Sequence, residues 1–114
     1  MTPHDAPSLD ELIEAVREWL ERDVMRATDG RLQFHTRVAI NALSIVEREL
    51  ALGPQQREAH LARLADLGVT DDAALATAIR SGELDDRMEE VRAVVWQSVR
   101  DKLAVANPKY LTSP

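Results

Sequence analysis

Apolar residues recur every three or four positions along most of the chain, the spacing at which side chains share one face of an α-helix. The periodicity predicts three long helices, over about residues 9–26, 31–52 and 86–106, and two short ones, over about residues 54–67 and 71–81. Leu, Val, Ile and Ala supply most of these faces, a composition that favours helices over sheets. The expected fold class is therefore all-α, a small helical bundle.

Local signals mark the helix ends. Ser8 stands three residues before Glu11, the spacing of a capping box that begins a helix. Gly53 and Pro54 are expected to end the second helix, and Pro54 to open the next one at its first position. Thr70 is expected to cap the fourth helix, because its hydroxyl can accept a bond from the first turn.

The apolar faces also predict which side chains point inward. The last helix is expected to bury Met88, Val91, Val95, Val99 and Ala106. Trp19 and Trp96 lie at the margins of apolar faces, and two interpretations of them are open. They pack in the core or, if exposed, they mark a surface that binds a partner.

Length and composition bound the class of protein. The 114 residues suit one domain over residues 1–114, with tails at about 1–7 and 108–114. The absence of cysteine excludes disulfides and thiolate nucleophiles. The formal net charge is −6 with both signs interspersed, so the chain lacks the basic field that attracts nucleic acid.

No segment approaches the roughly 18 apolar residues that a membrane-spanning helix needs. Residues 1–8 lack the basic region and apolar run of a secretory signal. We therefore expect a cytoplasmic protein that does not bind membranes.

Four polar residues fall inside apolar helix faces: Asp23, His35, Glu49 and Lys102. The short connection between the first two helices predicts an antiparallel pair, in which Asp23 lies about level with His35. A bond between them would make His35 a poised base or a ligand-binding imidazole. The alternative is a core histidine whose hydrogen bonds are satisfied.

Other polar residues allow further interpretations. Glu49 and Lys102 either form a buried ion pair or extend from helix ends to water. Arg37, Asn41 and Arg48 share one edge of the second helix, where they would bind a carboxylate or phosphate, or pair with surface glutamates.

Familiar catalytic and cofactor motifs are missing from the sequence. None of His4, His35 and His60 stands four residues from another, so no metal site is expected. The chain also lacks the glycine-rich phosphate loops and the Gly-x-Ser-x-Gly elbow of hydrolases. We expect no cofactor, and an enzyme is the least favoured class.

Two segments carry a family resemblance: the run from Asp29 to Leu50, with its Phe-His-x-Arg-Val-Ala-x-Asn core, and the run from Lys102 to Tyr110. They resemble an uncharacterised bacterial family called domain of unknown function 6285. The resemblance implies a small protein that is often encoded beside an aminoglycoside-phosphotransferase-like kinase and an acyl-CoA-dehydrogenase-like flavoprotein. It implies an accessory role in acyl-CoA or related metabolism and assigns no catalytic residues.

Two hypotheses about function follow. The preferred one is a non-enzymatic accessory protein that binds a neighbouring enzyme, or itself, through helix faces. The alternative is a protein that binds an anionic or acyl ligand around His35, Arg37 and Asn41, with Asn107 and Tyr110 closing the site from the end of the chain.

Overall fold

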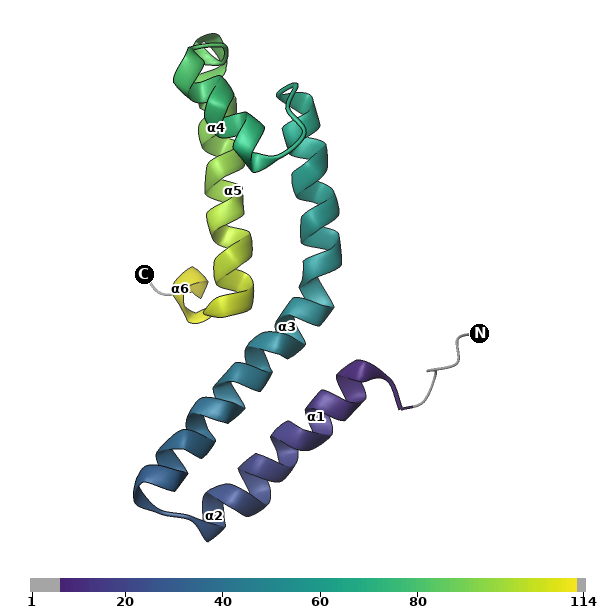
Figure 1. Ribbon diagram of the computed structural model, residues 1–114, viewed down its shortest axis with the longest axis vertical. Helices are drawn as coiled ribbons and strands as arrows, with labels where there is room; N and C mark the ends of the chain where they lie inside the picture. Colours follow the sequence, from purple (N-terminus) through teal and green to yellow (C-terminus); the bar gives the residue numbers. More distant parts are fainter. Residues whose placement is uncertain (1–6, 113–114) are drawn as a thin grey trace. The chain divides into compact units, whose positions relative to one another are not determined.

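The computed structural model describes residues 7–112, and this part of the chain is helical and contains no strand (Figure 1). The elements in order are α1 (Leu9–Trp19), the π-helical turn η1 (Leu20–Val24), α2 (Met25–Ala27), α3 (Gly30–Asp66), α4 (Asp72–Ser81), the 3-10 turn η2 (Asp85–Arg87), α5 (Met88–Ala106) and α6 (Lys109–Thr112). The all-α prediction is confirmed.

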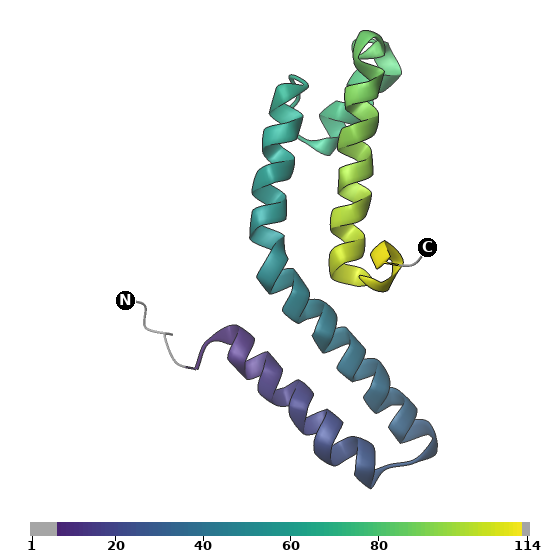
Figure 2. The ribbon, with the colours of Figure 1, turned by 180° about the vertical axis from the view of Figure 1, so that it is seen from behind.

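The chain divides into two compact units, residues 1–51 and residues 52–114, and the boundary lies within α3. The first unit is a hairpin in which α1, η1 and α2 run beside the N-terminal part of α3 (Figures 1 and 2). Gln33 Nε2 closes the connection, donating to the carbonyl oxygens of Met25 (3.1 Å) and Thr28 (3.0 Å).

The first helix begins as the sequence predicts. The backbone N–H of Glu11 donates to Ser8 Oγ (3.4 Å), and the N–H of Ser8 donates to Glu11 Oε1 (3.3 Å). Each bond satisfies a donor that the start of a helix leaves without a partner. Expectations for residues 1–6, including most of the N-terminal tail, lie outside the described residues.

α3 is one helix of 37 residues, where the sequence predicted two. The expected end at Gly53 and Pro54 is wrong, because the helix continues through both. Proline removes one backbone hydrogen bond and crowds the carbonyl four residues earlier, which costs about 3 kcal/mol. This cost arises at a single position, and the stabilisation from packing of the flanking helical turns can exceed it.

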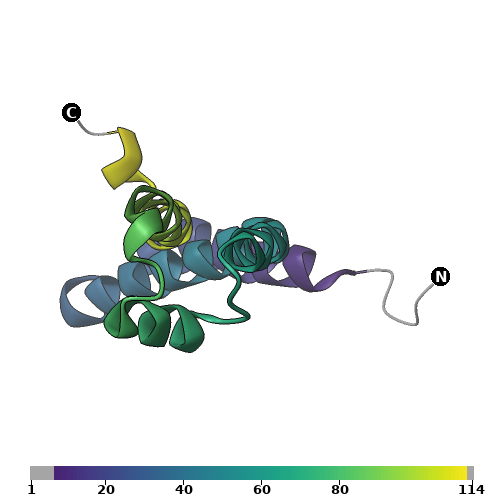
Figure 3. The same ribbon diagram turned by 90° about the horizontal axis from the view of Figure 1, so that it is seen from above.

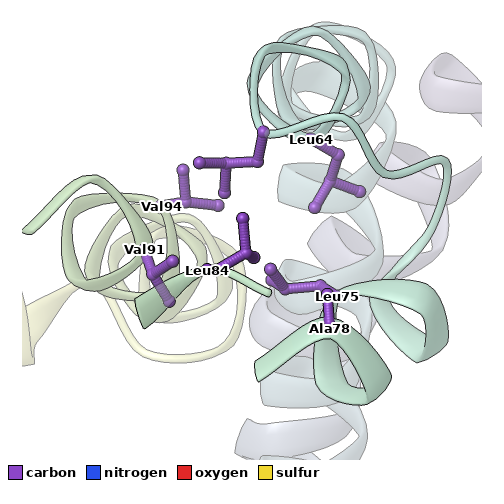
Figure 4. Packing of buried hydrophobic residues seen from close by; sticks show 7 residues of the cluster. Leu64, Leu75, Ala78, Leu84, Val91 and Val94 are labelled. Carbon is purple, nitrogen blue, oxygen red and sulfur yellow. The ribbon is translucent and has the colours of Figure 1, made fainter. Parts of the chain in front are cut away.

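The second unit has a compact apolar core (Figure 4). Viewed from above, α5 stands beside the C-terminal part of α3 and α4 lies across one side of the pair (Figure 3). Together with the turn before α5, these helices bury Leu64, Leu67, Leu75, Ala78, Leu84, Val91 and Val94.

The ends of α4 are set by local chemistry. The N-cap is Asp71, whose Oδ1 accepts from the N–H of Ala74 (2.7 Å), so the predicted cap at Thr70 is wrong by one residue. A carboxylate also suits the positive end of the helix dipole better than a hydroxyl. Gly82 ends the helix at φ 84°, a left-handed conformation that glycine adopts without strain.

The inward face of α5 differs from the predicted one. Val91, Val94 and Val105 are buried, whereas Val95 (45% exposed) and Val99 (41%) are not. The helix turns Ser98 and Asp101 toward α3, where both find polar partners, instead of turning its most apolar stripe inward. After Asn107 and Pro108, residues 109–112 form α6 where we expected a tail.

We expect Leu64→Ala to lower the free energy of unfolding by about 2–5 kcal/mol, because Leu64 is 1% exposed and its removal leaves a cavity in the core. Leu61→Ala is the matched control, since Leu61 lies on the same helix and is 51% exposed. Urea titration followed by circular dichroism measures both. Equal losses for the two variants would contradict the described core.

Candidate functional site

The predicted site residues fall in both units. Six lie in the first unit (Asp23, His35, Arg37, Asn41, Arg48 and Glu49) and three in the second (Lys102, Asn107 and Tyr110). Arg48 and Asn107 are half-buried, and the others are exposed. The four polar residues that the sequence places inside apolar faces are therefore at the surface, where no burial cost demands a partner.

His35 has a local environment different from the one expected. Arg31 Nε donates to His35 Nε2 over 3.4 Å, a long hydrogen bond within α3. The ring of Phe34 meets the imidazole edge-on, with 5.6 Å between centroids. Asp23 and His35 are both exposed, and the predicted bond between them is not found among the described residues.

The first hairpin is tied together by an ion pair that sequence reasoning missed. Arg17 binds Glu47 through both Nε and Nη2, and its Nη1 donates to Glu21 (3.0 Å). Glu47, and then Glu21, raise the pKa of the Arg17 guanidinium. The side chains of Arg17 and Glu47 are half-buried between the helices, so water screens the pair only in part.

An open hollow of about 410 Å³ lies next to this pair. It is lined by Leu9, Asp10, Glu14, Glu47, Leu50 and Ala51. None of the residues predicted from the sequence lines it. A hydrogen bond with Glu18 raises the pKa of Glu14, as expected where carboxylates crowd together. The carboxylates make the hollow unsuitable for an anionic ligand.

A polar cluster joins the helices of the second unit. His60 Nε2 lies 2.7 Å from Asp72 Oδ1, and His60 Nδ1 lies 3.3 Å from Ser98 Oγ. The order Asp–His–Ser matches that of a hydrolase triad, but Ser98 Oγ also donates to the carbonyl of Val94 (3.1 Å). Ser98 lies in the middle of α5 rather than at a strand-to-helix turn. The geometry supports a structural role.

The same face of α5 carries Asp101. Arg63 Nη2 (3.2 Å) and Gln97 Nε2 (2.9 Å) donate to its carboxylate, and Gln56 Nε2 donates to its carbonyl oxygen (3.1 Å). These bonds explain why α5 is rotated about its axis so that Ser98 and Asp101, rather than Val95 and Val99, face α3. Ser98 and Asp101 are three residues apart on α5, but this spacing indicates a polar contact face only when the facing helix, with His60 and Arg63, is known.

The surface of the first unit is unusually apolar. Within residues 7–51, ten large apolar side chains are between 37% and 62% exposed, and the one buried residue is Thr36. They are Leu9, Leu12, Val16, Trp19, Leu32, Phe34, Val38, Ile45, Val46 and Leu50. Monomeric proteins rarely expose so large an apolar surface without a binding role.

The second unit exposes a smaller apolar stripe on α5, formed by Val95, Trp96 and Val99. Trp96 is 63% exposed. Three exposed cations, Arg92, Arg100 and Lys102, lie on the same helix beside the stripe. We refer to these six residues as the α5 ridge.

Residues 7–112 also bear on metal binding and membrane insertion. No group of three or more histidine or acidic side chains is placed to hold a metal ion in this range. None of the helices described is both long enough and apolar enough to cross a membrane.

Comparison with known protein families gives a match. The model of a family described as "Domain of unknown function (DUF6285)" matches residues 26–110, which include all of α3, α4 and α5. No curated protein and no solved structure matches the chain.

We expect Arg17→Ala to destabilise the protein by roughly 1–3 kcal/mol, because Glu47 loses its half-buried partner. Arg22→Ala is the matched control, since Arg22 pairs with Glu18 in an exposed contact on the same helical segment. Urea titration measures both. If the control costs as much as Arg17→Ala, the ion pair does not hold the hairpin.

Proposed function

The chain belongs to the DUF6285 family, and we propose that it is a non-enzymatic accessory protein that binds a protein partner through the α5 ridge. The resemblance described above implies the candidate partners: a kinase-like phosphotransferase and an acyl-CoA-dehydrogenase-like enzyme of a bacterial cytoplasm. The observation that carries the proposal is the exposed, apolar and basic surface of α5.

The ridge has the chemistry of an interface hot spot. Tryptophan and arginine are enriched among residues that carry binding energy, because both combine a large contact area with a polar group. Trp96 shares the exposed part of α5 with Val95, Val99 and three cations, whose aliphatic stems can cover further apolar surface. A partner helix or groove would cover this stripe.

Charge narrows the kind of partner. The whole chain has a net charge of −6, yet the ridge presents three cations. A locally basic surface on an acidic protein favours binding to a partner whose apolar groove is bordered by carboxylates. It disfavours binding to a basic partner surface. The partner we propose is therefore an enzyme with an acidic, apolar surface patch.

The ridge is not needed to build the second unit. Val91, Val94 and Val105 form the buried side of α5, and the polar bonds of Ser98 and Asp101 fix its orientation. Val95, Trp96 and Val99 lie outside this contact face. Substitutions in the ridge should leave the fold intact.

The test is a titration of the purified chain against each purified candidate enzyme, followed by calorimetry. We expect binding to one of them, and Trp96→Ala to weaken it by roughly 30-fold or more, as for a hot-spot tryptophan. Arg100→Glu should also weaken binding by reversing the local charge.

Tyr110→Ala is the matched control, because Tyr110 is an exposed aromatic residue of the same unit outside the ridge. It should bind like the unsubstituted chain. Equal affinities of the Trp96→Ala and Tyr110→Ala variants, or no binding to either enzyme, would contradict the proposal.

A further inference from the structure

We propose that the chain forms an antiparallel homodimer in which the N-terminal half of α3 packs against the same segment of a second copy, with the twofold axis at Ala42. This interface lies in the first unit, whereas the proposed function uses the α5 ridge of the second. Each proposal can therefore fail without the other.

The first unit needs a further helical layer. The side of α3 that faces α1 includes Thr36, Ile40, Leu43 and Glu47, which are half-buried or buried. A second apolar stripe, which includes Phe34, Val38, Val46 and Leu50, lies between this side and the polar edge of Arg37, Asn41 and Arg48, and its side chains are exposed. An apolar face wider than one neighbouring helix can cover is normally packed against a further surface.

The uncovered side of α3 has a defined centre line. At about 100° per residue, positions seven apart fall close together on one face, which places His35, Ala42 and Glu49 in a row. Val38 and Ile45 lie on one side of this row, and Ala39 and Val46 on the other. We call these seven residues the α3 seam.

The α3 seam is complementary to itself. In an antiparallel pair whose axis passes through Ala42, a residue a given number of positions before Ala42 lies level with the residue as many positions after it. Each side of the row also faces the same side of the row in the second copy. Val38 therefore packs beside Ile45, and Ala39 beside Val46, of the second copy. Every apolar position of the seam finds an apolar partner.

The one polar pair in this register is also complementary. His35 and Glu49 are each seven residues from Ala42, so His35 of one copy lies opposite Glu49 of the other. An imidazole N–H donates to a carboxylate whether or not the histidine is charged. Ala39 and Ala42 at the centre are small enough to let the two helices approach closely, at about 8 Å.

Exposed apolar area is available on α3 for a second copy. The side chains of Phe34, Val38, Ile45, Val46 and Leu50 are between 37% and 58% exposed, and an α3 helix of a second copy would cover them. Binding to an unrelated protein would require only that the α3 surface be apolar. It would not require polar and apolar positions that mirror each other about Ala42, so this symmetry favours a second copy.

The first test is the oligomeric state of the full chain by light scattering and sedimentation velocity. We expect a dimer, and a monomer for Ala42→Arg, which places two cations together at the axis. Because Ala42 is exposed within one chain, circular dichroism should show unchanged helix content. A monomeric unsubstituted chain, or a dimeric Ala42→Arg variant, would overturn the proposal.

The second test is a charge exchange. His35→Glu places carboxylates opposite each other twice per dimer and should weaken the dimer by roughly tenfold or more. Adding Glu49→Lys should restore it. The two positions are about 21 Å apart along one helix, so they cannot meet within one chain and restoration requires a second copy.

The matched control combines His35→Glu with Glu58→Lys, which makes the same change of net charge at an exposed position on α3 outside the seam. It should stay weakened. Restoration by Glu58→Lys, or none by Glu49→Lys, would refute the proposed register. Enzyme binding that depends on Trp96 would still support the proposed function after such a result.

Discussion

The first unit is governed by a simple constraint: two helices packed side by side cover only one side of each other. A helix hairpin has no interior, so any apolar residue away from the contact line remains in water. Thr36 is the one buried residue of the described part of this unit, and its hydroxyl donates to the carbonyl of Leu32 (2.8 Å). The apolar surface that remains is the reason to look for another layer of helices.

The second unit satisfies the same constraint with a third helix. α4 lies across α3 and α5, and its Leu75 and Ala78 complete a core around Leu64. That core and the hydrogen bonds of Asp101 fix the orientation of α5. The exposed stripe with Trp96 is therefore not needed to stabilise the fold. Stability and an available binding surface therefore arise from the two sides of one helix.

Features set by neighbouring residues were predictable from the sequence, and features set by distant ones were not. The capping box at Ser8 acts within one helical turn, and this prediction is confirmed. The continuation of α3 through Pro54 and the polar cluster around His60 depend on packing between helices. Periodicity shows that a helix has an apolar side but does not identify what covers it.

The polar residues of α3 illustrate the same limit at the candidate site. His35 and Glu49 lie within an apolar face, where the sequence predicted a hydrogen-bonded histidine and left two alternatives for Glu49, a buried ion pair or a side chain extended to water. Both are exposed, so the conflict between a polar side chain and an apolar face does not arise within a single copy. This conflict arises only when another helix covers the apolar face. His35 and Glu49 each lie seven residues from Ala42, so an identical, antiparallel helix would place His35 of one copy opposite Glu49 of the other.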